Sequence, residues 1–86
     1  MYIHLGQSVM VPQASILGIF DLDNTTQSHR TRAFLERAEK EGRLVPLFDD
    51  LPKSFVLCQE GGETTVYMSQ LASSTLLKRA EGNGLG

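Results

Sequence analysis

The sequence predicts a small α+β domain built mainly from antiparallel strands, with one long helix and a short C-terminal helix. Short apolar runs separated by turn residues indicate several strands. A Gly-Gly pair at 61–62 lies between two such runs and predicts a tight β-hairpin. One amphipathic stretch of helical period lies near the middle of the chain. At 86 residues, the chain has the size of one domain, which we place at residues 1–80.

Three short strands are expected before residue 23. Residues 2–5 alternate weakly between apolar and polar, and residues 9–11 form an extended run that Pro12 ends or places at a sheet edge. Residues 15–22 form an apolar run typical of a buried strand, in which Gly18 permits close backbone approach.

A helix is expected over residues 27–41, because Phe34 and Ala38, with Leu35 beside them, recur at helical spacing. Gly42 occupies the place of the left-handed residue that ends many helices. Hydroxyls at the other end can accept from the first free helical N–H groups; they belong to Thr25, Thr26 and Ser28.

The remaining elements follow from the same patterns. Residues 44–48 predict a short strand, which Pro46 places at an edge. Residues 54–58 and 64–69 form the two arms of the hairpin. Residues 71–79 predict a short helix, and the tail at 81–86 is expected to be disordered. The helix is expected to turn three leucines inward: Leu71, Leu76 and Leu77.

Composition favours an ordinary globular protein of the cytoplasm. Apolar residues make up 41% and charged residues 21%. No apolar run approaches the roughly 20 residues that cross a bilayer, and the first residues do not resemble a secretory signal. The single cysteine, Cys58, has no partner for an intramolecular disulfide. With a net charge of −2, nucleic-acid binding would require a local basic surface.

The stretch "GIFDLDNTT" at 18–26 is similar to the nucleophile loop of a magnesium-dependent phosphatase, with Asp21 and Asp23 as its carboxylates. That chemistry also needs a cation and a further acidic pair. Lys40 or Lys53 could supply the first, and Asp49 with Asp50 the second. The end of a strand followed by helix-capping residues explains the same sequence without a catalytic site. We therefore expect no enzyme, no small-molecule substrate, no cofactor and no metal.

Basic residues near the start of the long helix and in the terminal helix allow two interpretations. Arg32–Glu36 and Glu36–Lys40 are spaced as i,i+4 pairs, which predicts a solvated surface of mixed charge. Alternatively, the cations line a surface that an oligomer repeats many times, so that weak phosphate contacts add up. The candidate nucleic-acid contacts are Arg30, Arg32, Lys53, Lys78 and Arg79.

Five segments in order resemble the RemA/RemB (YaaB-type) family of bacterial extracellular-matrix and biofilm regulators. They are "MYIHLG", "VMVP", "SILGIFDL", "FLERAEKEGRLV" and "VYMSQLASSTLLKR", and the resemblance runs from Met1 to about Arg79. It implies a cytoplasmic protein with a LytTR-like domain that assembles into a ring. RemA-type members are DNA-binding activators of matrix genes.

The family's DNA-contacting arginines match Ser15, and Asp50 with Leu51, in this chain, while Lys53 matches a nearby basic position. These departures remove phosphate contacts, and Asp50 adds repulsion. Two alternatives therefore stay open: a regulator whose DNA-binding surface has moved to Arg30 and Arg32, or an oligomeric scaffold for protein interaction without DNA affinity.

Self-association should use sheet edges and apolar side chains, because a chain this short has little interior to hide them. The candidate interface residues are Tyr2, Val9, Val11, Phe48, Phe55, Tyr67 and Met68.

Overall fold

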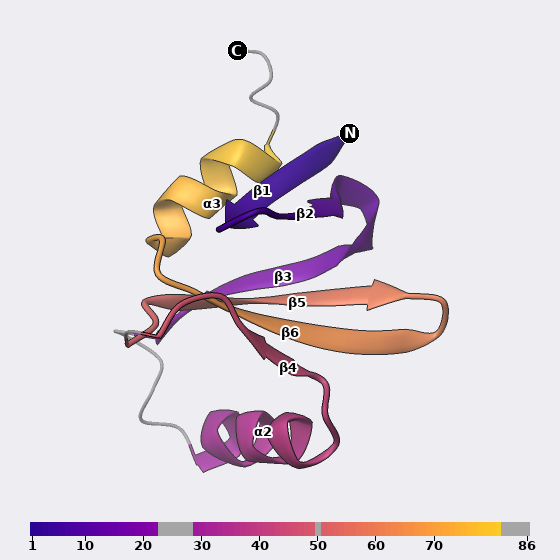
Figure 1. Ribbon diagram of the computed structural model, residues 1–86, viewed down its shortest axis with the longest axis vertical. Coiled ribbons are helices and arrows are strands. Elements are labelled where there is room, and N and C mark those ends of the chain that lie inside the picture. Colours follow the sequence, from indigo (N-terminus) through magenta and orange to yellow (C-terminus); the bar gives the residue numbers. More distant parts are fainter. Residues whose placement is uncertain (23–28, 50, 82–86) are drawn as a thin grey trace.

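Two sheets and two helices lie in layers in the computed structural model, which describes residues 1–22, 29–49 and 51–81. A two-stranded sheet and one helix cover one face of a four-stranded sheet, and the other helix lies on the opposite side (Figure 1). The elements in chain order are β1 (Tyr2–Gly6), β2 (Val9–Pro12), the 3-10 helix η1 (Gln13–Ser15), β3 (Ile16–Asp21), α2 (His29–Lys40), β4 (Leu44–Pro46), β5 (Ser54–Glu60), β6 (Glu63–Ser69) and α3 (Ser73–Ala80).

The four-stranded sheet has the order β3-β5-β6-β4. Its β3–β5 and β5–β6 pairs are antiparallel, and the β5–β6 hairpin confirms the prediction from the Gly-Gly pair. Gly61 and Gly62 have φ values of 59° and 86°, the left-handed conformation that a tight hairpin turn requires. The edge strand β4 runs parallel to β6, so the sheet is mixed. The small α+β class is confirmed, whereas the parallel pair is a feature that local sequence patterns did not indicate.

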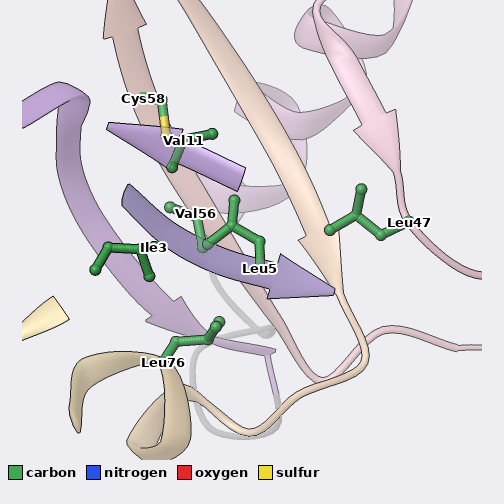
Figure 2. Packing of buried hydrophobic residues seen from close by; sticks show 7 residues of the cluster. All are labelled: Ile3, Leu5, Val11, Leu47, Val56, Cys58 and Leu76. Atoms are coloured by element: carbon green, nitrogen blue, oxygen red, sulfur yellow. The ribbon is translucent and has the colours of Figure 1, made fainter. Parts of the chain in front are cut away.

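The larger core cluster fills the space between the two sheets and α3 (Figure 2). Alternation along β1 turns Ile3 and Leu5 inward and leaves Tyr2 and His4 exposed. The cluster's buried members come from β1, β2, the segment after β4, β5 and α3; they are Ile3, Leu5, Val11, Leu47, Val56, Cys58 and Leu76. This cluster joins the two-stranded sheet to the larger one.

The helix α2 covers the other face of the four-stranded sheet and buries a narrow stripe of its apolar side chains against it. Ala38 is fully buried against Phe55 and Val66, with Phe34 and Leu35 beside it, as the helical spacing predicted. Gly42 has φ 75°, and the Arg43 N–H donates to the Ala38 carbonyl at 2.8 Å, which confirms the predicted C-terminal end. The predicted start of this helix and its capping hydroxyls lie outside the described residues.

The third strand differs from its predicted burial. β3 is an edge strand, and the side chains of Leu17 and Phe20 are 57% and 40% exposed. The register shifts between Ile16 and Gly18, so Leu17 is the extra residue of a bulge and faces solvent. A Cβ on Gly18 would lie 2.8 Å from the Phe20 ring, which confirms the close approach expected there and shows that an aromatic ring makes it.

The terminal helix differs in one of its three expected inward leucines. Leu76 is fully buried and Leu71 packs partly against the core, but Leu77 is 43% exposed. Successive helical residues point about 100° apart, so the buried Leu76 directs Leu77 outward. The Glu81 N–H donates to the Leu77 carbonyl at 2.9 Å and closes the last turn. The rest of the predicted tail, residues 82–86, lies outside the described residues.

Two buried serines hold the layers together. The Ser69 hydroxyl donates to the Leu5 carbonyl at 2.9 Å and accepts from the Leu71 N–H at 3.0 Å. The Ser54 hydroxyl donates to the Leu71 carbonyl at 2.8 Å. These bonds tie the ends of β5 and β6 to β1 and to the segment that leads into α3.

Candidate nucleic-acid interface

A basic hollow lies where the C-terminal turn of α3 meets β1. Lys78 and Arg79 are both exposed in the last turn of the helix. With residues 1–4 they line an open hollow of about 400 Å³. Figure 1 shows the α3 helix beside β1, although the two elements lie at opposite ends of the chain. Two of the predicted nucleic-acid contacts are thus neighbours on a concave surface.

Hydrogen bonds fasten the two walls of this hollow to each other. The Arg79 Nη1 donates to the His4 carbonyl at 2.8 Å. Gln13 bridges both walls, because its backbone N–H donates to the Met1 carbonyl at 2.8 Å and its side-chain amide donates to the Ala80 carbonyl. The position of β1 relative to α3 is therefore fixed by polar contacts as well as by the core beneath them.

The role of Gln13 was not found from the sequence, because its side-chain contact spans 67 residues. Its polar side chain between a strand-ending proline and a buried run carries no local signal for a distant partner. His4 lies in β1 and is exposed. Its Nε2–H donates to the carbonyl of Gln7, which closes the β1–β2 turn.

The first turns of α2 place the other arginine pair in a different setting. Arg30 and Arg32 are both exposed. Arg30 and Thr31 border a groove of about 280 Å³ whose other lining residues are apolar: Phe20, Phe34, Phe55 and Leu57. Figure 1 shows α2 and α3 on opposite sides of the four-stranded sheet, so the two predicted basic pairs do not form one surface.

The positions that match the family's DNA-contacting arginines do not form a basic surface here. Ser15 is buried, and its hydroxyl donates to the Pro12 carbonyl at 2.7 Å. Leu51 is 85% exposed, and Asp50 lies outside the described residues. Lys53 is exposed, and hydrogen bonds hold its backbone in place. Its N–H donates to the Ser69 carbonyl at 2.8 Å, and its carbonyl accepts from the Leu22 N–H at 3.0 Å.

Arg43 has a structural role instead. Its guanidinium forms a salt bridge with Glu41 and donates to the Thr64 carbonyl at 3.2 Å, which ties the end of α2 to β6. Within the described part of the chain, the structure shows this salt bridge and does not show the Arg32–Glu36 and Glu36–Lys40 pairs expected from spacing. Arg32, Glu36 and Lys40 are all exposed.

The structure also sorts the candidate interface residues. Val11 and Phe55 are buried within the subunit, so neither offers a surface to a second copy, and the expectation is corrected for these two. Tyr2 is 62% exposed and lines the basic hollow. Phe48 and Met68 line a separate hollow of about 210 Å³ beside β4. Val9 and Tyr67 are partly buried against the larger cluster.

Of the two aspartates in the stretch at 18–26, the structure describes Asp21. Asp21 is the last residue of β3 and pairs with Ser54 in the ladder, as expected for the end of a strand. Asp23 and the predicted capping residues lie outside the described residues. Among the residues that are described, no three His, Cys, Asp or Glu side chains gather as ligands for a metal ion.

Cys58 lies in the core of β5, where burial raises the pKa of its thiol above the ordinary value of 9.0. A hydrogen bond with Ser15 opposes this shift, and the charge of Glu60 adds to it. The folded chain therefore keeps this proton more tightly than the unfolded chain. The thiol is neutral at physiological pH and unsuited to act as a nucleophile.

This raised pKa predicts that the free energy of unfolding falls as the pH rises above 9.0, because the unfolded thiol ionises first. Urea unfolding at a series of alkaline pH values would measure the decline. Cys58→Ala should flatten it, apart from the share of Tyr67, whose pKa burial also raises above 10.0. Equal slopes for the two proteins would contradict the assignment to Cys58.

No helix within the described ranges is both long and apolar enough to cross a membrane. No family model matches the chain. It is, however, 38% identical over 81 residues to extracellular matrix regulatory protein B of Bacillus subtilis (strain 168). The similarity covers 94% of this chain and 91% of the relative. Identity at this level over nearly the whole length of both proteins shows common descent, as the order of the sequence motifs indicated. The chain therefore belongs to the RemA/RemB family of extracellular matrix regulatory proteins.

Proposed function

We propose that this protein is a homo-oligomeric cytoplasmic regulator of extracellular-matrix genes that binds DNA through phosphate contacts of Lys78 and Arg79. Its membership of the family supports the regulatory role. The single observation that carries the DNA contact is the basic hollow, in which two exposed cations lie on a surface held by hydrogen bonds.

The hollow supports phosphate binding better than the other candidate surfaces do. Arg30 borders a groove lined mainly by aromatic and aliphatic side chains. Ser15 is buried and uncharged, and Leu51 presents an apolar side chain where a phosphate would need a cation. Lys78 and Arg79, in contrast, lie side by side in a hollow that, among the residues that the structure describes, is lined by no carboxylate.

An exposed apolar edge supports the oligomeric part of the proposal, and an oligomer would strengthen the DNA contact. Leu17 and Phe20 expose apolar surface on the edge strand β3, where a second copy can cover it. A ring would also repeat the two cations of each subunit around its surface. Repetition multiplies weak contacts through effective concentration, so a chain of net charge −2 can bind DNA with few basic groups per subunit.

Fluorescence anisotropy of a labelled DNA duplex across a range of salt concentrations tests the DNA contact. We expect binding that weakens steeply with salt, because each phosphate contact contributes about 0.9 to the logarithmic slope. Lys78→Ala/Arg79→Ala should weaken binding at least about 10-fold. The matched control is Arg37→Ala/Lys40→Ala, which removes the same charge from the exposed side of α2.

Light scattering of the same samples tests the assembly, which we expect to be a closed oligomer. A monomer at working concentrations would contradict the oligomeric part of the proposal. Equal losses of DNA affinity in the two double variants would show that only total charge matters, and the absence of binding at low salt would contradict the DNA contact itself.

The second candidate function is an oligomeric scaffold that binds proteins rather than DNA. The exposed Leu51 and the buried Ser15 favour it, because both stand where the family's DNA-contacting arginines are expected. This alternative predicts the same oligomer without DNA affinity. Neither proposal includes catalysis: Asp21 ends a strand, and an Asp21→Asn variant should behave like the original chain in both assays.

A further inference from the structure

We infer that the hollow between β1 and α3 binds a nucleotide with an unstacked base, which lies against Tyr2 while Lys78 and Arg79 bind its phosphate. The nucleotide can belong to a nucleic-acid strand or be free in solution. This inference deepens the DNA binding proposed above by naming the ligand's form, and it can be tested separately from that function.

The lining residues combine the phenol ring of Tyr2 with two cations. Tyr2 is 62% exposed, and it lines the same hollow as Lys78 and Arg79. The sequence suggested separate roles for these residues, with Tyr2 at a subunit interface and the cations on DNA. Their meeting in one hollow of about 400 Å³ points instead to one ligand that has both a planar apolar part and an anionic part.

The ring of Tyr2 is carried by a well-held strand. Tyr2 pairs with Pro12 across the two-stranded sheet, and its neighbour Ile3 is buried in the core. The Met1 carbonyl before it accepts the backbone N–H of Gln13. A ring on such a strand can stack on a base without first being ordered, and every base offers a face for stacking.

The cations are positioned to hold a phosphate beside that ring. Arg79 uses Nη1 for the His4 carbonyl, and a guanidinium has five N–H donors, so others remain for an anion. The C-terminal end of a helix repels anions, but here the Ala80 carbonyl already accepts the side-chain amide of Gln13. Lys78 and Arg79 bring two positive side chains into the lining of the hollow.

An unstacked base distinguishes this site from general phosphate binding. In a duplex the bases are stacked on each other, and a surface ring reaches their faces only at ends or unpaired stretches. The site should therefore favour a single strand over a duplex of the same length, and a nucleoside monophosphate over inorganic phosphate. Aromatic side chains that stack on bases show little preference among the four bases, because every base has a face that can stack.

Two measurements test the inference. The first is the anisotropy of a labelled oligothymidylate and of a duplex of equal length, with Tyr2→Ala and Tyr2→Phe variants. We expect Tyr2→Ala to weaken single-strand binding about 10-fold and Tyr2→Phe to restore most of the loss. The second is an amide NMR titration with thymidine 5′-monophosphate and with inorganic phosphate. The monophosphate should shift the amides of residues 2–4, 78 and 79 at lower concentration than phosphate does.

The outcomes separate this inference from the proposed function. If Lys78→Ala/Arg79→Ala weakens duplex binding but Tyr2→Ala changes nothing, the function stands and the inference is wrong. If thymidine monophosphate shifts the hollow but no strand binds, the inference stands for a free nucleotide and DNA binding is wrong. Shifts confined to other parts of the chain, or equal shifts with phosphate alone, would overturn the site.

Discussion

Replacing Leu76 by alanine is expected to lower the free energy of unfolding by about 2–5 kcal/mol, a large part of the stability of a small domain. Leu76 is fully buried, and it inserts from α3 into the cluster that joins the two sheets (Figure 2). Alanine leaves a cavity where the helix packs against β1 and β3. Urea unfolding followed by far-UV circular dichroism at fixed protein concentration measures the loss.

Leu77→Ala is the matched control, since it removes the same atoms from the next residue of the same helix. Leu77 is 43% exposed, so its truncation should change the free energy of unfolding by less than about 1 kcal/mol. Equal losses in the two variants would mean that Leu77 is buried in the assembled protein. The pair therefore tests the corrected orientation of α3, which also sets the position of Lys78 and Arg79.

Local patterns predicted most of the elements because their causes are local. The Gly-Gly turn, the left-handed Gly42 and the alternation in β1 each depend on neighbours within a few residues. The parallel pairing of β4 with β6 depends on where α2 returns the chain, and no short pattern encodes that. Leu17 is exposed because it is the extra residue of a bulge. In the sequence it looks like any other apolar residue of a strand, because the pairing that creates the bulge depends on the partner strand.

The sequence selected two of the charged residues of the candidate site, but it did not predict their arrangement. Lys78 and Arg79 were selected for their charge, and both lie in the hollow. Tyr2 was assigned to an interface because a pattern shows that a side chain is apolar and outward, not what stands beside it. The bonds from Gln13 to Met1 and Ala80 connect the two ends of the domain, and only the folded chain brings them together.

Phe55→Ala is expected to unfold the subunit rather than to separate subunits. Burial is nearly complete for Phe55, whose ring stacks on Phe20 with centroids 4.8 Å apart and lies 6.5 Å from the ring of Phe34. Truncating a buried phenylalanine lowers the free energy of unfolding by about 3–5 kcal/mol. An interface residue would behave differently, because its loss lowers the oligomeric mass while each subunit keeps its fold.

Phe20→Ala gives the contrast, because this ring is 40% exposed on the edge strand β3. Its truncation should destabilise the subunit less than Phe55→Ala does, and light scattering should show weaker self-association, since Phe20 offers a surface that a second copy can cover. A folded Phe55→Ala protein of reduced mass would return Phe55 to the interface. Because assembly and stability are linked by mass action, both variants must be compared at one protein concentration. A loss of fold at Phe55 and of mass at Phe20 would show that copies of this chain meet at the exposed ring on the edge strand β3, and not at the neighbouring part of the same sheet face that α2 buries.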